Sequence, residues 1–306
     1  MYDRITVPLD GSTFGREALP AARAVARRSN GTLRLVHVHA MFPPIEGEQP
    51  SRPFLEMEEE AREADRERLG VLAAGLADEG FAVETELLEG PVVETLAADV
   101  NARADLVVMS THGRGAFSRF WLGSVADGLI RSAETPVLLI RPDEDRAEAA
   151  PEPSVESILV TLDGSRLSEQ ILGPAGEFAR LFGARLRLLQ VIPPVMAPGF
   201  AYPDLPVGLD AASVEDLKAS AAAGLKRVAG KLEAEGHEVE ADVLVDPRPA
   251  AAILDACQET GPSLVAMATH GRGGLRRVVL GSVTDKVVRG ADRPVLVYRP
   301  RPADTG

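Results

Sequence analysis

A glycine-rich stretch occurs twice in the chain, as THGRGAFSRFWLGSV (Thr111–Val125) and as THGRGGLRRVVLGSV (Thr269–Val283). Each copy follows an apolar run typical of a buried strand and precedes a run typical of a helix. Glycines after a strand can adopt positive φ, which lets backbone N–H groups gather around an anion. The free N–H groups at the start of the next helix, together with the helix dipole, also favour phosphate. The stretch therefore predicts a phosphate-binding site.

Particular residues of each copy suit that chemistry. Gly113 and Gly115 would shape the turn, Gly123 would precede the helix, and the Ser124 hydroxyl can donate one further hydrogen bond. The second copy repeats these residues as Gly271, Gly273, Gly281 and Ser282. A purely structural alternative is that the glycines make a tight turn and the serine caps a helix. Ten of the sixteen positions from 110 to 125 are identical in 268 to 283, and the neighbouring regions diverge more, which favours a binding site.

An aspartate ends the first apolar run of each half, in PLDGS (Asp10) and in TLDGS (Asp163). In an open α/β sheet, a carboxylate at the end of a strand can accept hydrogen bonds from a ribose or an amine. The same residue can instead cap the helix that follows. The local sequence leaves both interpretations open.

Several kinds of catalytic site are excluded because their characteristic sequence motifs do not occur in the chain. The GxxxxGK[ST] motif of P-loop ATPases is absent, and GRGAFS and GRGGLR lack the third glycine of a dinucleotide-binding GxGxxG. Neither a GxSxG motif nor a zinc-ligand spacing among the histidines occurs. His112 and His270, beside the glycines, are interpreted as turn-stabilising residues, although each can contact phosphate.

The apolar pattern predicts the scaffold that would position these residues. In the first half the strand-like runs are RITVPLD, TLRLVHVH, AVETELL, DLVVMS and PVLLI, and the second half repeats them as ILVTLD, RLRLLQVI, EVEADVLV, SLVAMA and PVLVY. Helices are expected between them, in the first half roughly at 15–29, 53–79, 91–102 and 124–132. Pro20 and Pro174 fall inside the first helix of each half, which predicts a helix start or a kink near them. The alternation indicates βαβ units, with helices on both faces of a parallel sheet.

The repeat also predicts the domain organisation. ITVPLDGS (Ile5–Ser12) returns as ILVTLDGS (Ile158–Ser165), and TPVLLIRP (Thr135–Pro142) returns as RPVLVYRP (Arg293–Pro300), in the same order as the glycine stretches. A period of about 150 residues is the size of a domain, so two copies of one domain are expected. They would span 1–142 and 155–300, joined by an acidic, proline-containing linker at 143–154 and followed by a tail at 301–306.

The overall composition limits which classes of partner and which cellular compartment are expected. The chain has 306 residues and a net charge of −13, which disfavours nucleic acid and anionic membrane surfaces. No apolar run is long enough to span a membrane, and the start of the chain has no apolar signal core. The single cysteine, Cys257, precludes an intramolecular disulfide and fits a reducing compartment. A cytoplasmic protein is therefore expected.

Taken together, the strand-end aspartates, the glycine stretches and the terminal PVL strands resemble the universal stress protein family, and the whole chain resembles a tandem member of it. The motif of the ATP-binding branch is G-2x-G-9x-G-[ST]. Gly113, nine residues and Gly123–Ser124 match its latter part, as do Gly271, nine residues and Gly281–Ser282. Ser110 and Ala268 stand where the motif has its first glycine, which is a departure, although both residues are small.

The resemblance implies two Rossmann-like domains, each with a five-stranded parallel sheet of order 3-2-1-4-5 and helices on both faces. It implies ATP as the cofactor, with which Mg²⁺ can come, and it implies adenine near the backbone of Val38 or Val191 and the nucleoside near Asp10 or Asp163. Ribose and phosphates would contact the strand ends, the glycine loops and the helix starts. The complete implied site is Pro8, Asp10, Val38, Met109, Ser110, Gly113, Arg114, Gly115, Gly123, Ser124 and Val125 in the first half, and Asp163, Val191, Met267, Ala268, Gly271, Arg272, Gly273, Gly281, Ser282, Val283 and Thr284 in the second.

The resemblance further implies that the two halves pair within the chain through their last strands, and that two chains can form a dimer. The leading functional hypothesis is a nucleotide-binding regulatory or stress-response switch, without dedicated catalytic machinery, which an unidentified protein partner reads. One alternative is a slow ATPase or an autophosphorylating protein, for which arginines of the glycine stretches such as Arg119 and Arg276 are available. The other is a nucleotide-independent interaction protein with degenerate sites, since Pro8 and Ala126 are replaced by Thr161 and Thr284 in the second half.

Overall fold

A computed structural model describes residues 2–40, 51–111, 122–142, 152–194, 211–261, 263–269 and 280–301, and of 211–213 the backbone alone. The chain divides into two compact units, Met1–Pro153 (unit 1) and Ser154–Gly306 (unit 2). Most of the expected linker, at 143–151, lies outside the described residues. The predicted pairing of the two halves through their last strands stays a prediction.

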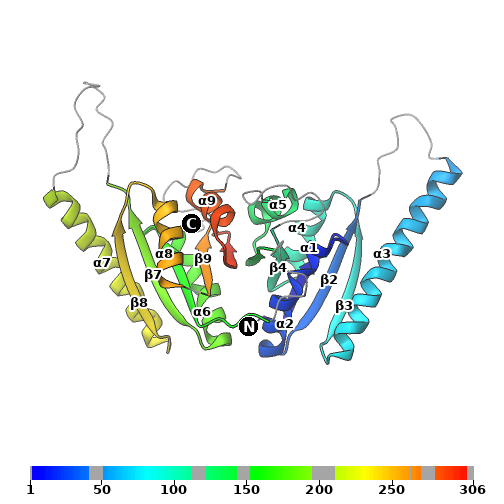
Figure 1. Cartoon of the computed structure of the whole chain (residues 1–306), viewed down its shortest axis with the longest axis horizontal. Helices are drawn as coiled ribbons and strands as arrows, with labels where there is room; N and C mark the ends of the chain where they lie inside the picture. Colours follow the sequence, from blue (N-terminus) through cyan, green and yellow to red (C-terminus); the bar gives the residue numbers. More distant parts are fainter. Residues whose placement is uncertain are drawn as a thin grey trace, which may run out of the picture. The chain divides into compact units, whose positions relative to one another are not determined.

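Unit 1 alternates strands and helices as the sequence predicts (Figure 1). Its strands form a parallel sheet in the order β3-β2-β1-β4-β5. In chain order its described elements are β1 (Arg4–Pro8), α1 (Thr13–Arg16), α2 (Leu19–Ser29), β2 (Thr32–His39), α3 (Arg52–Asp78), β3 (Val83–Glu89), α4 (Val92–Arg103), β4 (Leu106–Ser110), α5 (Ser124–Ser132) and β5 (Val137–Ile140).

Unit 2 repeats this topology, with its strands in the order β8-β7-β6-β9-β10. Each unit therefore has the predicted order 3-2-1-4-5 when its own strands are counted from one. The described elements of unit 2 are β6 (Ser157–Leu162), η1 (Ser168–Ile171), α6 (Leu172–Phe182), β7 (Arg185–Ile192), α7 (Ala211–Ala234), β8 (Val239–Val245), α8 (Pro249–Thr260), β9 (Leu264–Ala268), α9 (Ser282–Gly290) and β10 (Val295–Tyr298).

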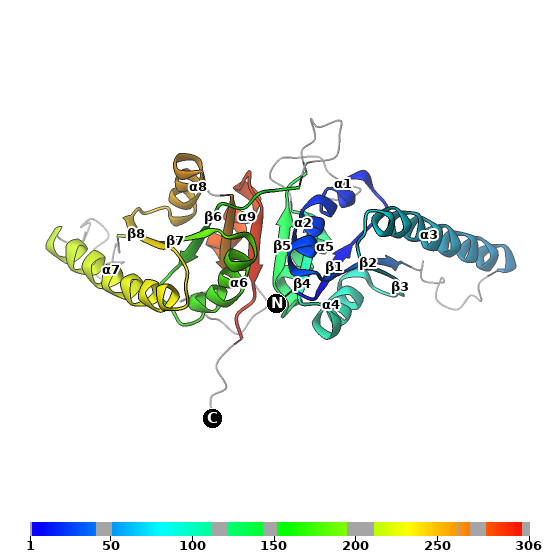
Figure 2. The same ribbon diagram turned by 90° about the horizontal axis from the view of Figure 1, so that it is seen from below.

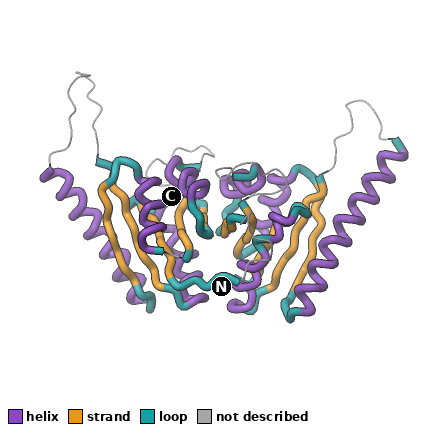
Figure 3. The backbone as a smooth tube through the Cα atoms, in the orientation of Figure 1, coloured by secondary structure: helices purple, strands orange, loops and turns teal. Residues whose placement is uncertain are grey.

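Helices cover both faces of each sheet, so the central strands are buried on both sides (Figure 3). Every residue of β4, β6 and β9 is buried, and in β1 only Arg4 is exposed. The edge strands β3 and β8 instead consist of exposed and half-buried residues. In unit 1, Figure 2 shows α4 on the opposite side of β1–β3 from α2 and α3. This division follows from right-handed crossovers that run in opposite directions from β1.

The single helix expected at 15–29 is instead broken into α1 and α2. Pro20 lies at the second position of α2, where its missing N–H would have no partner inside the helix anyway. In unit 2, Pro174 lies in the first turn of α6, and a short 3₁₀ helix, η1, precedes it. The prolines thus mark helix starts, which is one of the two outcomes that the sequence predicted.

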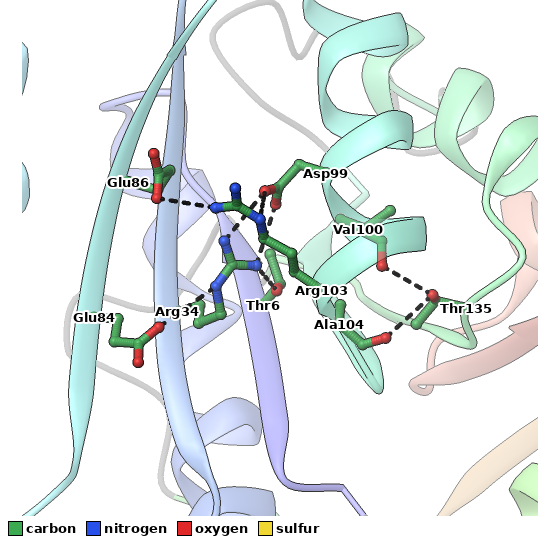
Figure 4. A network of polar contacts seen from close by, with 9 residues as sticks. All are labelled: Thr6, Arg34, Glu84, Glu86, Asp99, Val100, Arg103, Ala104 and Thr135. Atoms are coloured by element: carbon green, nitrogen blue, oxygen red, sulfur yellow. Dashed lines mark hydrogen bonds and ion pairs between the residues drawn. The ribbon is translucent and has the colours of Figure 1, made fainter.

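A buried ion pair fastens α4 to the sheet of unit 1 (Figure 4). The Arg34 guanidinium on β2 donates two hydrogen bonds of 3.2 Å to the carboxylate of Asp99 on α4, and one of 3.1 Å to the hydroxyl of Thr6 on β1. Glu84 lies 3.7 Å from the same guanidinium, at the exposed edge of the network. Because Arg34 points toward α4, the odd-numbered residues of β2 face α3 on the other side of the sheet.

Candidate functional site

The strand order leaves a crevice in unit 1 at the carboxyl ends of β1 and β4. From β1 the chain moves outward to β2 and then to β3, whereas β4 and β5 lie on the other side of β1. The connections therefore diverge between β1 and β4, which is where open α/β sheets bind ligands. Asp10 follows β1, and α5 begins at Ser124 after β4.

A cavity of about 800 Å³ opens at this point of unit 1. Its volume falls within the range of about 300–1,000 Å³ that is usual for small-molecule sites. Every described residue that the sequence analysis assigned to the site of the first half lines it, namely Pro8, Asp10, Val38, Met109, Ser110, Gly123, Ser124 and Val125. The remaining three assigned residues, Gly113, Arg114 and Gly115, lie outside the described residues.

The start of α5 faces the cavity and offers backbone donors. Gly123 caps the helix, and its own N–H donates to the carbonyl of Thr111 across 2.8 Å, which closes the base of the glycine loop. The Gly123 carbonyl accepts the first bond inside the helix, from the N–H of Asp127 at 2.9 Å. Helix geometry leaves the N–H groups of Ser124, Val125 and Ala126 without partners inside the helix. These groups can bind an anion that enters the cavity.

Asp10 shapes the other side of the crevice through Ser12. The Oδ1 atom of Asp10 accepts hydrogen bonds from the Ser12 N–H at 2.9 Å and from its hydroxyl at 2.6 Å. The Ser12 hydroxyl oxygen in turn accepts the N–H of Gly15 at 3.0 Å, so that Ser12, and not Asp10, caps α1. A Cβ atom added at Gly15 would lie 2.8 Å from Asp10 Oδ1, so a side chain at position 15 would displace the Asp10 carboxylate from its present place.

Two histidines and two carboxylates form a part of the site that the sequence analysis missed. His37 and His39, two residues apart on β2, lie near Glu58 and Asp65 of α3, and His37, His39 and Asp65 line the cavity. The VHVH pattern of β2 is a sequence signal for them, because alternate residues of a strand share a face. No local pattern indicates which helix residues would meet that face.

The predicted site residues of unit 2 occupy equivalent places. Asp163 follows β6 and accepts the N–H of Ser165 at 2.9 Å, while Gly281 caps α9 and donates to the carbonyl of Thr269 at 2.9 Å. Thr284 is buried, and its hydroxyl donates to the carbonyl of Ala268 at 3.0 Å. Val191 lies in β7, Met267 and Ala268 end β9, and Ser282 and Val283 begin α9, whereas Gly271, Arg272 and Gly273 lie outside the described residues.

The two units differ beside their aspartates. Where unit 1 has Gly15, unit 2 has Ser168, which is buried and whose hydroxyl lies 3.3 Å from the backbone nitrogen of Asp163. The same hydroxyl donates to the carbonyl of Ser165 at 2.9 Å. The turn after β6 therefore carries a buried side chain at the position where the turn after β1 has none.

Metal and membrane features were sought in the described part of the chain. It holds no group of three or more His, Cys, Asp or Glu side chains arranged to bind a metal ion. None of its helices combines the length and the apolar character needed to cross a bilayer. Mg²⁺ that comes with the nucleotide stays a prediction.

Comparisons with known proteins agree with this architecture. The model of the universal stress protein family matches residues 1–141 and 154–299. A universal stress protein of Mycobacterium tuberculosis is 32% identical over 305 residues, which cover 96% of each chain, and one of Mycolicibacterium smegmatis is 30% identical over 97% of each. The crystal structure of a universal stress protein from Archaeoglobus fulgidus has the same fold, with a TM-score of 0.69 and 21% identity over 97% of this chain and 98% of that one.

Proposed function

The chain belongs to the universal stress protein family, and from this premise we propose that it binds an adenine nucleotide in unit 1 and acts as a regulatory switch. The observation that carries the proposal is the convergence on one cavity of about 800 Å³ of eight residues that the sequence and its family resemblance assigned to the site. These residues come from four places in the chain: the end of β1, β2, the end of β4 and the start of α5. A site assembled from such distant segments is difficult to explain as helix capping alone.

The two sides of the cavity suit the two ends of a nucleotide. The N-terminus of α5 carries the positive end of the helix dipole and free N–H groups, which suit phosphates even in a chain of net charge −13. In the proposed pose the base lies along the backbone of Val38 and the ribose lies near Asp10. The cavity is lined more by apolar than by charged residues on its β4 and α4 sides, where Met109, Val92 and Leu96 contribute.

We propose that the chain binds and signals rather than turns over its ligand. Phosphoryl transfer requires cationic groups that neutralise the developing charge. Arg68 is the only lysine or arginine among the described residues that line the cavity, and it pairs with Asp65. A protein partner would then read the occupied state. Slow hydrolysis of ATP is the alternative that the following test also addresses.

The test is equilibrium dialysis of the full chain against ATP, with and without Mg²⁺, followed by assay of ADP. In Gly123→Val the new side chain would crowd the start of α5, because a Cβ atom at the equivalent Gly281 would lie 2.9 Å from the carbonyl oxygen of Thr269. We expect this variant to lose ATP binding in unit 1 by at least about tenfold in Kd, which is about 1.4 kcal/mol.

Gly75→Val is the matched control, since a Cβ atom at Gly75, on the exposed part of α3, meets no atom within 4 Å. It should bind ATP like the unaltered chain. Unchanged binding by Gly123→Val and Gly281→Val alike would refute the proposed site. Appearance of ADP that both valine variants abolish would instead favour the slow ATPase.

A further inference from the structure

Four ionisable side chains join β2 to α3 beside the cavity of unit 1. His37 and His39 extend from β2, and Glu58 and Asp65 from α3. The side chains of His39 and Asp65 are 8% and 9% exposed, and that of Glu58 is 13% exposed. Ionisable groups are rarely this buried unless they are paired. Neither phosphate binding nor the turn after β1 accounts for this cluster.

Both ring nitrogens of His39 face carboxylate oxygens. Its Nδ1 atom lies 2.7 Å from Asp65 Oδ2, and its Nε2 atom lies 3.1 Å from Glu58 Oε2. Ionised carboxylates only accept hydrogen bonds, so both contacts require an N–H on each nitrogen, which is the imidazolium form of the ring. A neutral ring would hold a lone pair against one of the carboxylates. The two contacts therefore exist together only while His39 is protonated.

Other charged groups face this pair from the surrounding elements. From β2, His37 Nε2 lies 3.4 Å from Asp65 Oδ2, while its Nδ1–H donates to the carbonyl of Leu9 at 2.6 Å. From α3, Arg68 pairs with Asp65, and Arg62 lies 3.0 Å from Glu89, the residue of β3 in register with His39. Two further charged groups lie nearby: Arg16 of α1 lines a small space with His37 and Asp65, and Asp10 follows β1.

The charges around His39 favour its protonated form, as the geometry of its two contacts does. The hydrogen bond to Asp65 raises the pKa of His39 above its usual value, and the contact with Glu58 adds to this, although burial opposes it. Burial acts to raise the pKa of Asp65, but the bond to His39 and the nearby His37 and Arg68 lower it overall. Because the pKa of His39 is raised by folding, its stabilising contacts are fully present below the usual pKa of histidine, as long as Asp65 and Glu58 are ionised, and they are lost as pH rises through the raised pKa.

We propose that His39, Asp65 and Glu58 form a pH-dependent latch that fastens α3 to β2 and tunes the affinity of the unit 1 cavity for an anionic ligand. The effect on affinity rests on the proposed function, whereas the latch itself does not. With the latch closed, α3 holds Ala61, Ala64 and Asp65 along the cavity. When His39 loses its proton, one of its carboxylate contacts is lost, and the first half of α3 is held less firmly.

Loss of the proton also removes one positive charge from beside the cavity. The carboxylates of Asp65 and Glu58 then remain, and they repel an anionic ligand. A single charge about 10 Å away in a medium of intermediate dielectric changes an anion's affinity by roughly fivefold. Looser packing of α3 acts in the same direction. Affinity for ATP should therefore fall as the solution becomes more alkaline.

Unit 2 lacks the latch and serves as an internal control. Alignment of the sheet registers places Gln190 at the position of His37 and Ile192 at that of His39. The buried leucines Leu69 and Leu225 align α3 with α7, which places Ala221 at the position of Asp65. By the same alignment, Val214 stands in place of Glu58. The first half of α7 should therefore show no comparable response to pH.

The experiment measures the full chain in two ways between about pH 6 and pH 9, the range in which a histidine of raised pKa titrates. The first is amide hydrogen exchange without ligand, corrected for intrinsic exchange, which compares protection in 52–65 with that in 214–221. The second is the Kd for ATP of the unaltered chain and of His39→Gln, so that the titration of ATP itself cancels in the ratio. Glu58→Gln provides a second, milder variant, because it keeps a polar side chain of the same size at the exposed end of the cluster.

The latch predicts that protection of α3 falls with rising pH by roughly tenfold while that of α7 does not, and that His39→Gln and Glu58→Gln abolish the difference. It also predicts a roughly fivefold rise in Kd that both variants flatten. His237→Phe, which introduces the residue found at the equivalent Phe81, is the matched control and should leave both measurements unchanged. Protection of α3 that does not depend on pH overturns the latch. Intact pH-dependent protection with no ATP bound at any pH would leave the latch standing and overturn the proposed ligand.

Discussion

Removal of the Asp99 carboxylate tests the account of how unit 1 is held together. Arg34 and Asp99 have side chains that are 5% and 6% exposed, and they share two hydrogen bonds of 3.2 Å. In Asp99→Ala the guanidinium keeps the Thr6 hydroxyl at 3.1 Å and Glu84 at 3.7 Å, and the side chain of Glu84 is 68% exposed. A buried charge is then left without its main partner.

The expected cost follows from that geometry. Breaking a buried ion pair by removing one partner typically destabilises a protein by about 3–5 kcal/mol. Glu84 and water at the sheet edge can offset part of this, so we expect a loss of about 3 kcal/mol in the free energy of unfolding of unit 1. The double variant Arg34→Met/Asp99→Ala should recover much of the loss, because no unpaired charge remains in it.

Urea denaturation of the full chain, followed by far-UV circular dichroism, measures this effect. Glu84→Ala is the control, since an exposed ion pair contributes about 0–1 kcal/mol. The reasoning would be refuted by a loss below about 1 kcal/mol in Asp99→Ala, the range of an ordinary surface pair. It would be refuted equally by a double variant less stable than Asp99→Ala alone.

Three further outcomes are expected at single positions. Burial raises the pKa of the Cys257 thiol to about 11. In the native chain this thiol should therefore resist a disulfide reagent near neutral pH and react only after denaturation. Rapid labelling of Cys257 in the native chain would contradict this. In Gly31→Ala the new Cβ atom would lie 2.5 Å from the carbonyl oxygen of Tyr2, so a loss of about 1–3 kcal/mol is expected in thermal unfolding. Gly230→Ala, whose Cβ atom meets nothing within 4 Å in the interior of α7, should instead stabilise the chain by about 0.5–1 kcal/mol.

The fold could be predicted from the sequence because each half carries its own complete set of strand-like and helix-like patterns. The apolar runs that predict strands coincide with the observed strands, and the end of α2 at Asn30 and of α6 at Gly183 carry the left-handed residues that usually stop helices. The expected helix at 15–29 was wrong in one respect, because the break between α1 and α2 depends on how Ser12 and Asp10 fold the turn before it. Pro20 marked the place without specifying the geometry.

The site could be predicted only in part, and the difference has a physical cause. Its phosphate side consists of backbone groups positioned by glycines and a helix start, which leave a local pattern in the sequence. The His39–Asp65 and Arg34–Asp99 pairs instead join residues 26 and 65 positions apart, and they depend on which helix covers which face of β2. Neither pair is repeated in unit 2, where Ile192 stands at the position of His39 and Ala256 at that of Asp99. The internal repeat of the sequence therefore did not point to either pair.

A crystal structure of the full chain grown with saturating ATP and Mg²⁺ tests the central claim most directly. The account predicts a nucleotide in the unit 1 cavity, with its base along Val38 and its phosphates within hydrogen-bonding distance of the N–H groups of Ser124 and Val125. A cavity that stays empty at saturating ATP, or a nucleotide bound only elsewhere on the chain, would contradict it.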